Sequence, residues 1–173
     1  MYKIAVAGTG YVGLVAGVCF AEVGHQVTCV DIDENKVNMM KQGISPIYEA
    51  GLEELMQKNY AAGRLTYTTD YSQAYKDADA IFIGVGTPEQ PDGSANLSYI
   101  ATVARQIAET IEKDCLIVVK STVPVGTNDS LMNTHSMTGS RPNGFQSSQD
   151  GRRAPPRRGE GSGEPTRDRR SSA

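Results

Sequence analysis

The chain has 173 residues and a formal net charge of −3, and this length is typical of one domain with an appendage. The charge is divided unevenly, because residues 1–133 carry 9 basic and 16 acidic side chains whereas residues 134–173 carry 8 and 4. The second segment contains no Ile, Leu, Val, Tyr or Cys, which excludes an apolar core of its own. None of the three cysteines has a neighbour at metal-ligand spacing, so no metal site is expected on them.

A glycine pattern follows the first predicted strand. The β-rich run 4–7 leads directly into Gly8, Gly10 and Gly13, a G-x-G-x-x-G at the start of an apolar, helix-like run. The next β-rich run is closed by Asp31, 18 positions after Gly13. A strand, a glycine turn, a helix, a second strand and an acid, in this order, form the fingerprint of a dinucleotide-binding unit.

Each residue of the fingerprint has an expected role. Gly8 permits a tight turn, Gly10 lets the backbone approach a pyrophosphate, and Gly13 lets the helix pack closely on the strand. The phosphates are expected on free N–H groups at the positive end of the helix dipole. Asp31 would accept hydrogen bonds from both hydroxyls of the adenosine ribose and repel a 2′-phosphate, which favours NAD over NADP. Lys36 would reach the same ribose, which weakens that preference.

Two other interpretations fit parts of this segment. Residues 4–21 carry no charge, as in a signal peptide or a membrane span. Four glycines interrupt this run, however, and strand-forming and charged segments follow it at once. The second alternative is a Rossmann-type domain that binds another adenosine ligand, such as a methyl donor, because it would carry similar glycines.

The remaining predicted elements alternate between helices and strands. Helices are expected over residues 11–23, 33–42, 51–61, 70–76 and 98–112, and strands over residues 26–30, 65–69, 80–85 and 115–120. Asp33 and Asp70 are the expected N-caps, while Gly24 and Gly43 are the expected helix stops. The alternation predicts a Rossmann-like, doubly wound α/β fold with a parallel sheet and helices on both faces.

Ligands of such sheets bind at the carboxyl ends of the strands. Four segments would form this edge, namely residues 8–13, Asp31, residues 85–88 and residues 121–124. Thr87 and Thr122 would face the nicotinamide half of a dinucleotide. A turn with Thr and Pro is by itself more often simple punctuation between elements, but the shared position of these two at strand ends favours a site.

Six motifs occur in order along the first 129 residues. They read Gly8-Thr-Gly-Tyr-Val-Gly-Leu, Gly24-His25, Val30-Asp-Ile-Asp, Pro46-Ile-Tyr-Glu, Val85-Gly-Thr-Pro and Lys120-Ser-Thr-Val-Pro-Val-Gly-Thr. With them the chain resembles the N-terminal NAD-binding domain of the UDP-glucose 6-dehydrogenases. Dehydrogenases of GDP-mannose or of N-acetylated UDP-sugars share the first motif, and the fourth and sixth motifs favour the UDP-glucose type.

The resemblance implies oxidation of a sugar C6 alcohol to a carboxylate with NAD, through a thiohemiacetal and a thioester on a cysteine. It also implies that the hydroxyl of Thr122 lies near the reacting water. Together with the fingerprint, it gives the expected cofactor-binding residues: Gly8, Thr9, Gly10, Tyr11, Val12, Gly13, Asp31, Lys36, Thr87 and Thr122.

The resemblance ends near residue 133. The family's Asn-Pro-Glu-Phe-Leu segment, its nucleophilic cysteine motif and its UDP-binding domain do not occur in the remaining residues. We therefore expect no catalytic residue here, and UDP-glucose as a partner only of the complete enzyme, which in the family is a homo-oligomer. Cys19, Cys29 and Cys115 are expected to be buried, reduced thiols of a cytoplasmic protein with no membrane partner.

Residues 134–173 are expected to form a disordered tail rich in Arg, Ser, Gly and Pro, following an incomplete domain over 1–133. One hypothesis is a truncated or frame-shifted gene. The other is a basic arm that binds nucleic acid. Within this segment four acids dilute the eight arginines, and Phe145 is the only Phe, Tyr or Trp, which favours the first hypothesis and no nucleic-acid partner. A nucleotide-binding or interaction module without catalysis also stays open.

Overall fold

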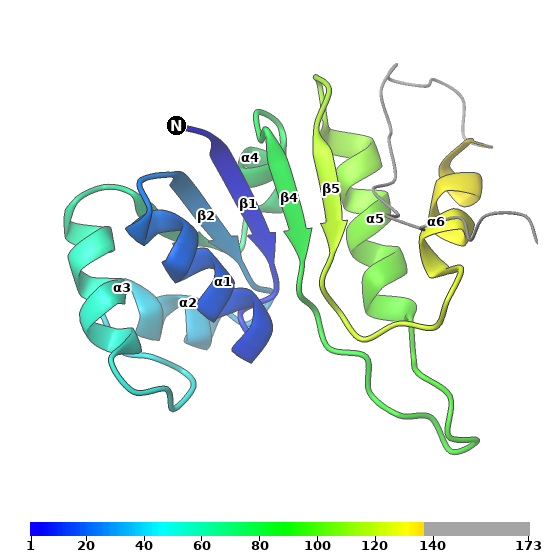
Figure 1. Cartoon of the computed structure of the whole chain (residues 1–173), viewed down its shortest axis with the longest axis horizontal. Helices are drawn as coiled ribbons and strands as arrows, with labels where there is room; N and C mark the ends of the chain where they lie inside the picture. Colours follow the sequence, from blue (N-terminus) through cyan, green and yellow to red (C-terminus); the bar gives the residue numbers. More distant parts are fainter. Residues whose placement is uncertain (137–173) are drawn as a thin grey trace, which may run out of the picture.

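The computed structural model describes residues 1–136, with side chains through residue 131. These residues form an alternating series of strands and helices (Figure 1). The elements are β1 (Lys3–Ala7), α1 (Tyr11–Glu22), β2 (Gln26–Val30), α2 (Glu34–Lys41), α3 (Leu52–Ala61), β3 (Leu65–Thr68), α4 (Tyr71–Tyr75), β4 (Ala80–Ile83), α5 (Ser98–Thr110), β5 (Leu116–Val119) and α6 (Thr127–Ser136). The predicted α/β class is confirmed.

The sheet has the strand order β3-β2-β1-β4-β5, and all its neighbouring strands are parallel. The chain begins in the middle of the sheet, moves outward to β3 and then crosses to the other side of β1. The order therefore reverses between β1 and β4, at the kind of switch point where α/β sheets bind ligands. Ala7 pairs with both Val30 and Ile83, which brings the carboxyl ends of these three strands level.

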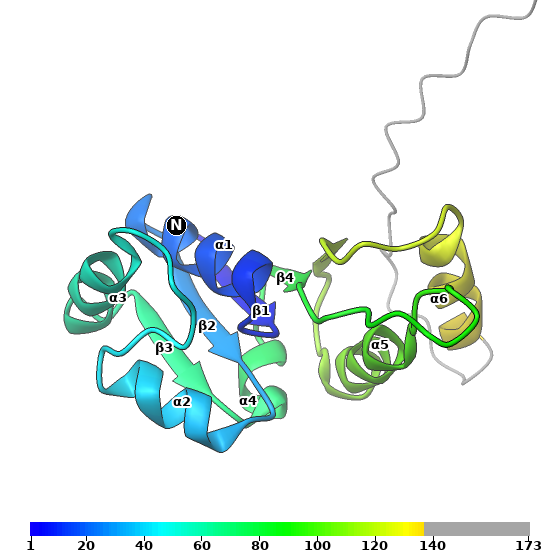
Figure 2. The ribbon, with the colours of Figure 1, turned by 90° about the horizontal axis from the view of Figure 1, so that it is seen from below.

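Alternate residues of β1 face two separate cores. Ile4 and Val6 pack in a cluster with α1, α2 and α3, whereas Ala5 and Ala7 pack in a cluster with α4 and α5. Figure 2 shows α1 on one side of the central strands and α4 on the other. Because side chains of a strand alternate between its faces, this pattern confirms the predicted doubly wound arrangement.

The helix ends follow the predicted signals. The side chain of Asp33 accepts hydrogen bonds from two N–H groups in the first turn of α2, and Asp70 does the same for α4. Gly24 and Gly43 follow α1 and α2 with φ of +98° and +78°, a conformation in which glycine carries no steric penalty. The uncharged run 4–21 is divided between β1, a turn and α1. None of the helices within residues 1–136 is long and apolar enough to cross a membrane.

Three burial predictions are wrong, those for Cys19, for Cys115 and for the strand over 115–120. Cys19 is exposed, because α1 contacts the sheet through the opposite face, whose buried residues are Gly13, Leu14, Gly17, Val18 and Ala21. Cys115 is only partly buried, because it precedes an edge strand, while Cys29 is fully buried as predicted. The run 115–120 was expected to be a buried strand. Among the described residues β5 pairs with β4 alone, and Leu116 at its start is 47% exposed.

Helix α6 passes the predicted domain boundary at residue 133 and is described to Ser136. It contacts α5, and Leu131 packs against the core beneath that helix. The predicted boundary lies where the family motifs stop, and the hydrogen bonds of a helix can continue past that point. The rest of the predicted tail, residues 137–173, lies outside the described residues.

Candidate functional site

Three glycines bring β1, α1 and the end of β4 into backbone contact. A Cβ on Gly13 would lie 1.9 Å from the carbonyl oxygen of Gly8, and a Cβ on Gly84 would lie 3.0 Å from the Cα of Gly13. Gly8 adopts a φ of +93°, which favours glycine. The turn and close packing predicted for Gly8 and Gly13 are thus present. Sequence reasoning missed Gly84, whose only signal was a glycine at the end of an apolar strand.

Gly10 has a different environment. Its φ is −74°, and a Cβ built on it would meet no described atom within 4 Å. It precedes α1, where no side chain caps the first turn. The N–H groups of a helix's first turn have no intrahelical partners, so here they are not satisfied by a capping side chain either. Tyr11 and Val12, the first residues of this turn, are both exposed. An open space in front of the positive end of a helix is suited to phosphate oxygens.

The carboxylate of Asp31 lies at the end of β2, directly beside the glycine turn. Its Oδ2 accepts hydrogen bonds from the Thr9 N–H at 2.9 Å and the Thr9 hydroxyl at 2.5 Å, and its Oδ1 accepts one from the Asp33 N–H at 3.0 Å. Burial alone would raise the pKa of this carboxyl. The hydrogen bonds from Thr9 and Asp33 and the charge of Lys36 outweigh burial and hold the pKa below its usual value. Asp31 is therefore ionised at neutral pH.

Two further side chains border this carboxylate. Lys36 lies in the first turn of α2 and acts on Asp31 through its charge. Ile32 is 87% exposed although it lies only two residues after the buried end of β2. Sequence reasoning did not select Ile32. The sequence signal that could have pointed to it is an apolar residue between Asp31 and Asp33, at a position where it does not join the core.

The loops after β4 and β5 meet as predicted. The hydroxyl of Thr87 donates a hydrogen bond to the carbonyl oxygen of Thr122 at 3.0 Å. The hydroxyl of Ser121 donates one to the carbonyl oxygen of Val85 at 2.6 Å. Ser121 belongs to the predicted edge but had no assigned role, and it fastens the two loops together. The strand order then places Asp31, the glycine turn and these two loops along one edge of the sheet.

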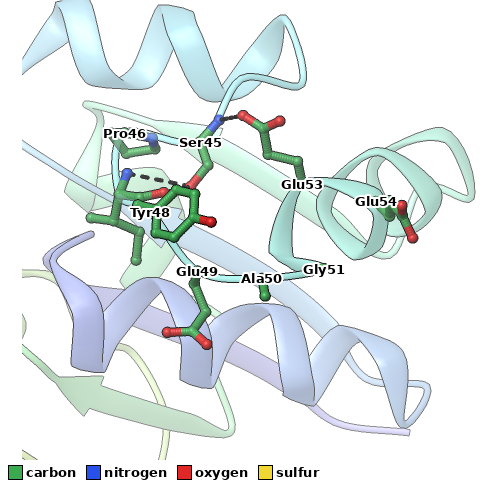
Figure 3. A pocket seen from close by; sticks show the side chains of 9 residues that line it. Ser45, Pro46, Tyr48, Glu49, Ala50, Gly51, Glu53 and Glu54 are labelled. Atoms are coloured by element: carbon green, nitrogen blue, oxygen red, sulfur yellow. Dashed lines mark hydrogen bonds between the residues drawn. The ribbon is translucent and has the colours of Figure 1, made fainter.

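The Pro46-Ile-Tyr-Glu segment borders this edge. The hydroxyl of Tyr11 donates a hydrogen bond to the carbonyl oxygen of Tyr48 at 2.9 Å, which ties the segment to the start of α1. With α3 the segment lines a hollow of about 480 Å³, whose lining residues are Ser45, Pro46, Ile47, Tyr48, Glu49, Ala50, Gly51, Glu53 and Glu54 (Figure 3). None of the predicted cofactor residues lines this hollow. The hydrogen bond from Tyr11 places it beside the expected cofactor edge.

The three cysteines of the described residues are not placed as activated nucleophiles at the carboxyl edge of the sheet. Burial raises the pKa of the Cys29 thiol to about 12 and that of the Cys115 thiol to about 11, so neither provides much thiolate at neutral pH. Cys19 lies on the outer face of α1, away from the carboxyl ends of the strands. Within residues 1–131, no three His, Cys, Asp or Glu side chains gather to hold a metal ion.

Comparison with known proteins decides the family. Residues 2–161 match the UDP-glucose/GDP-mannose dehydrogenase family, NAD binding domain. The chain belongs to this family. The matched range contains every predicted cofactor residue and runs further than the motifs over 1–129. It confirms the resemblance and NAD as the cofactor of this domain, in place of another adenosine ligand such as a methyl donor.

Individual members of the family show how much of the protein this chain represents. A UDP-glucose 6-dehydrogenase of Bacillus subtilis is 58% identical over 127 residues, which are 73% of this chain and 29% of that protein. One from Rhizobium meliloti is 51% identical over 130 residues, which are 75% of this chain and 30% of that protein. The chain thus spans about three tenths of the length of the curated relatives it matches.

Solved structures of the family share the fold. A UDP-glucose dehydrogenase from Pyrobaculum islandicum has a TM-score of 0.74 at 40% identity, covering 78% of this chain and 32% of that one. A GDP-mannose dehydrogenase from Pseudomonas aeruginosa has a TM-score of 0.72 at 42% identity, with the same two coverages. The fold of this domain therefore does not separate the two sugar nucleotides as substrates.

Proposed function

We propose that this chain is the NAD-binding part of a UDP-glucose 6-dehydrogenase, an enzyme that oxidises the C6 alcohol of UDP-glucose to the carboxylate of UDP-glucuronate. The observation that supports the proposal is the continuous edge of the sheet, where an ionised carboxylate, a glycine turn at a helix start and a pair of joined loops follow one another. These are the groups that a dinucleotide needs, in the order ribose, pyrophosphate and nicotinamide.

Different residues of this edge would bind different parts of the cofactor. Asp31 would hold the adenosine ribose, and the exposed side chain of Ile32 would lie against the adenine ring. Gly10 and the first N–H groups of α1 would hold the pyrophosphate. Thr87 and Thr122, fixed to each other, would border the nicotinamide. NAD supplies the hydride acceptor when it is bound, and the chain's own residues bind and orient it.

The catalytic groups are proposed to lie outside these 173 residues. The family resemblance implies a cysteine nucleophile in a later motif, which the chain does not contain. Cys29 cannot replace it because that thiol is buried in the core and its pKa is raised. UDP-glucose and the partner subunits of the family's homo-oligomer would then contact the complete enzyme.

The choice of UDP-glucose rests on sequence similarity rather than on the site. The groups that define the cofactor edge are those assigned to NAD, which these dehydrogenases have in common, so they do not distinguish one sugar nucleotide from another. Two curated UDP-glucose 6-dehydrogenases are more than half identical to the chain over the matched residues. The two solved structures do not add to this preference, because the UDP-glucose enzyme is 40% identical and the GDP-mannose enzyme 42%. A dehydrogenase of GDP-mannose or of an N-acetylated UDP-sugar is the second candidate.

A turnover assay tests whether the catalytic groups lie outside this chain. The purified 173-residue chain is mixed with UDP-glucose and NAD, and the absorbance of NADH is followed, with a full-length UDP-glucose 6-dehydrogenase as the positive control. We expect no NADH from the chain, because it holds the cofactor without a nucleophile or a sugar site. Sustained NADH production that depends on UDP-glucose would contradict the proposal that the catalytic groups lie elsewhere.

A further inference from the structure

Thr9 occupies a position of the glycine fingerprint for which the fingerprint specifies no residue type. Its side chain is nonetheless buried, with 1% of the residue exposed. Both of its hydrogen-bond donors, the N–H and the hydroxyl, are directed at the same oxygen of Asp31, 22 residues further along the chain. Thr9 is therefore poorly placed to contact a cofactor directly, although sequence reasoning included it among the cofactor-binding residues.

The hydrogen bonds to Asp31 limit what its carboxylate can still accept. A carboxylate offers about four lone-pair positions. Thr9 uses two of them, both on Oδ2, and the N–H of Asp33 uses one on Oδ1. About one position, on Oδ1, is left for a ribose hydroxyl. The expectation that Asp31 binds both hydroxyls of the adenosine ribose is thus reduced to one strong hydrogen bond in this arrangement.

The surroundings of this carboxylate form a set of groups that would bind an anion. The donors are the Thr9 N–H, the Thr9 hydroxyl and the Asp33 N–H, and the positive charge of Lys36 acts on the same position. Asp31 is the anion that occupies them. While it is held there, a 2′-phosphate meets a fixed negative charge, and the donors that could bind the phosphate are already engaged.

We propose that Thr9 is a positioning residue, which fixes the Asp31 carboxylate in this set of donors and so determines the preference of the domain for NAD over NADP. The inference rests on the proposed position of the adenosine ribose beside Asp31. It differs from the usual account of the acid at the end of the second strand, because the discrimination depends on a hydroxyl that never touches the cofactor.

Two substitutions of Thr9 in the full chain test the proposal. Thr9→Val removes the hydroxyl while keeping a similar shape, and Thr9→Ser keeps the hydroxyl. Calorimetric titrations with NAD and with NADP give the Kd of each. We expect Thr9→Val to raise the Kd for NAD about tenfold, the scale of one lost hydrogen bond to a charged group, and to reduce the NAD:NADP preference. Thr9→Ser should stay within about twofold of the original chain for both cofactors.

Titration of the Asp31 carboxyl by carbon NMR measures its pKa, which a change in packing at Thr9 would not alter without the loss of the hydroxyl. The charged group that acts on Asp31 is Lys36 on α2, and the N–H of Asp33 contacts it from the same turn. The pKa of Asp31 lies below its usual value in the original chain, so it should rise in Thr9→Val and stay low in Thr9→Ser. NAD affinity would then weaken at a higher pH in Thr9→Val as the solution is acidified.

Three results would overturn the proposal. They are an unchanged NAD:NADP preference in Thr9→Val, an equal loss in Thr9→Ser, and an Asp31 pKa that does not respond to the hydroxyl. If Thr9→Val does not fold, the NMR titration of the original chain still tests the proposal. A carboxyl of Asp31 that titrates at or above its usual pKa is not held by Thr9. The NMR titration needs no cofactor. A chain that shows the Thr9 dependence of the Asp31 pKa but does not bind NAD would overturn the proposed function instead.

Discussion

The substitution Gly13→Ala is expected to destabilise the domain by about 3 kcal/mol or more, a large part of the stability of a typical domain. The new Cβ would lie 1.9 Å from the carbonyl oxygen of Gly8, a separation that real atoms do not reach. The carbonyl oxygen is a backbone atom of the turn, and Gly84 packs closely against Gly13 from the side of β4. The strain therefore cannot be relieved by rotating a side chain, and β1, α1 or β4 must move.

Gly10→Ala is the matched control for this prediction. It adds the same methyl group three residues earlier, at a backbone conformation that alanine adopts and with no described atom within 4 Å. Its free energy of unfolding should change by less than about 1 kcal/mol, because a weaker N-cap and a less flexible unfolded chain oppose each other. Urea unfolding followed by circular dichroism compares the two variants. Equal midpoints for both would show that the close contact at Gly13 does not exist.

The second large effect is expected at Asp31. Asp31→Ala should weaken NAD binding by about 1.5–3 kcal/mol, which corresponds to a Kd about 10- to 150-fold higher, because it removes a charge-assisted hydrogen bond to the ribose. It also releases the donors of Thr9 and Asp33, so NADP should lose less affinity than NAD. Calorimetric titration of each cofactor into the folded variant measures both changes.

Asp70→Ala provides the control for this second prediction. Like Asp31, Asp70 lies just after a strand, but it caps α4 and follows β3, which β2 separates from β1 and its glycine turn. Its loss should lower the free energy of unfolding by about 1 kcal/mol and leave the Kd for NAD unchanged. If Asp70→Ala weakened NAD as strongly as Asp31→Ala, a general loss of stability rather than a ribose contact would explain the effect at Asp31.

Much of the fold was predictable because its signals are local. Strands of β-rich residues, glycines at helix ends and the N-caps Asp33 and Asp70 each depend on a few neighbouring residues, and the structure has them at or near the predicted positions. The fingerprint predicted which residues share one edge because parallel strands place their carboxyl ends together. The hydrogen bond between Thr87 and Thr122 confirms that the two loops meet.

The predictions that were wrong or missing depend on contacts distant in sequence. Helix α1 is apolar nearly all round, so its pattern did not reveal that Cys19 lies on the outer face. The apolar run of β5 resembles that of a central strand, and only the assembled sheet shows it at an edge. The contact between Thr9 and Asp31 joins two residues whose types are common in turns. Its significance depends on the orientation of both side chains, which no sequence pattern records.

The most direct test of this account is a calorimetric titration of NAD into the complete 173-residue chain, after circular dichroism has shown that the sample is folded. The account predicts saturable binding at a single site, and weaker binding in Gly10→Ala, whose methyl group would occupy the space left for the pyrophosphate. A folded chain that takes up no NAD, or that binds it equally well with alanine at position 10, would show that the carboxyl edge of this sheet is not the cofactor site.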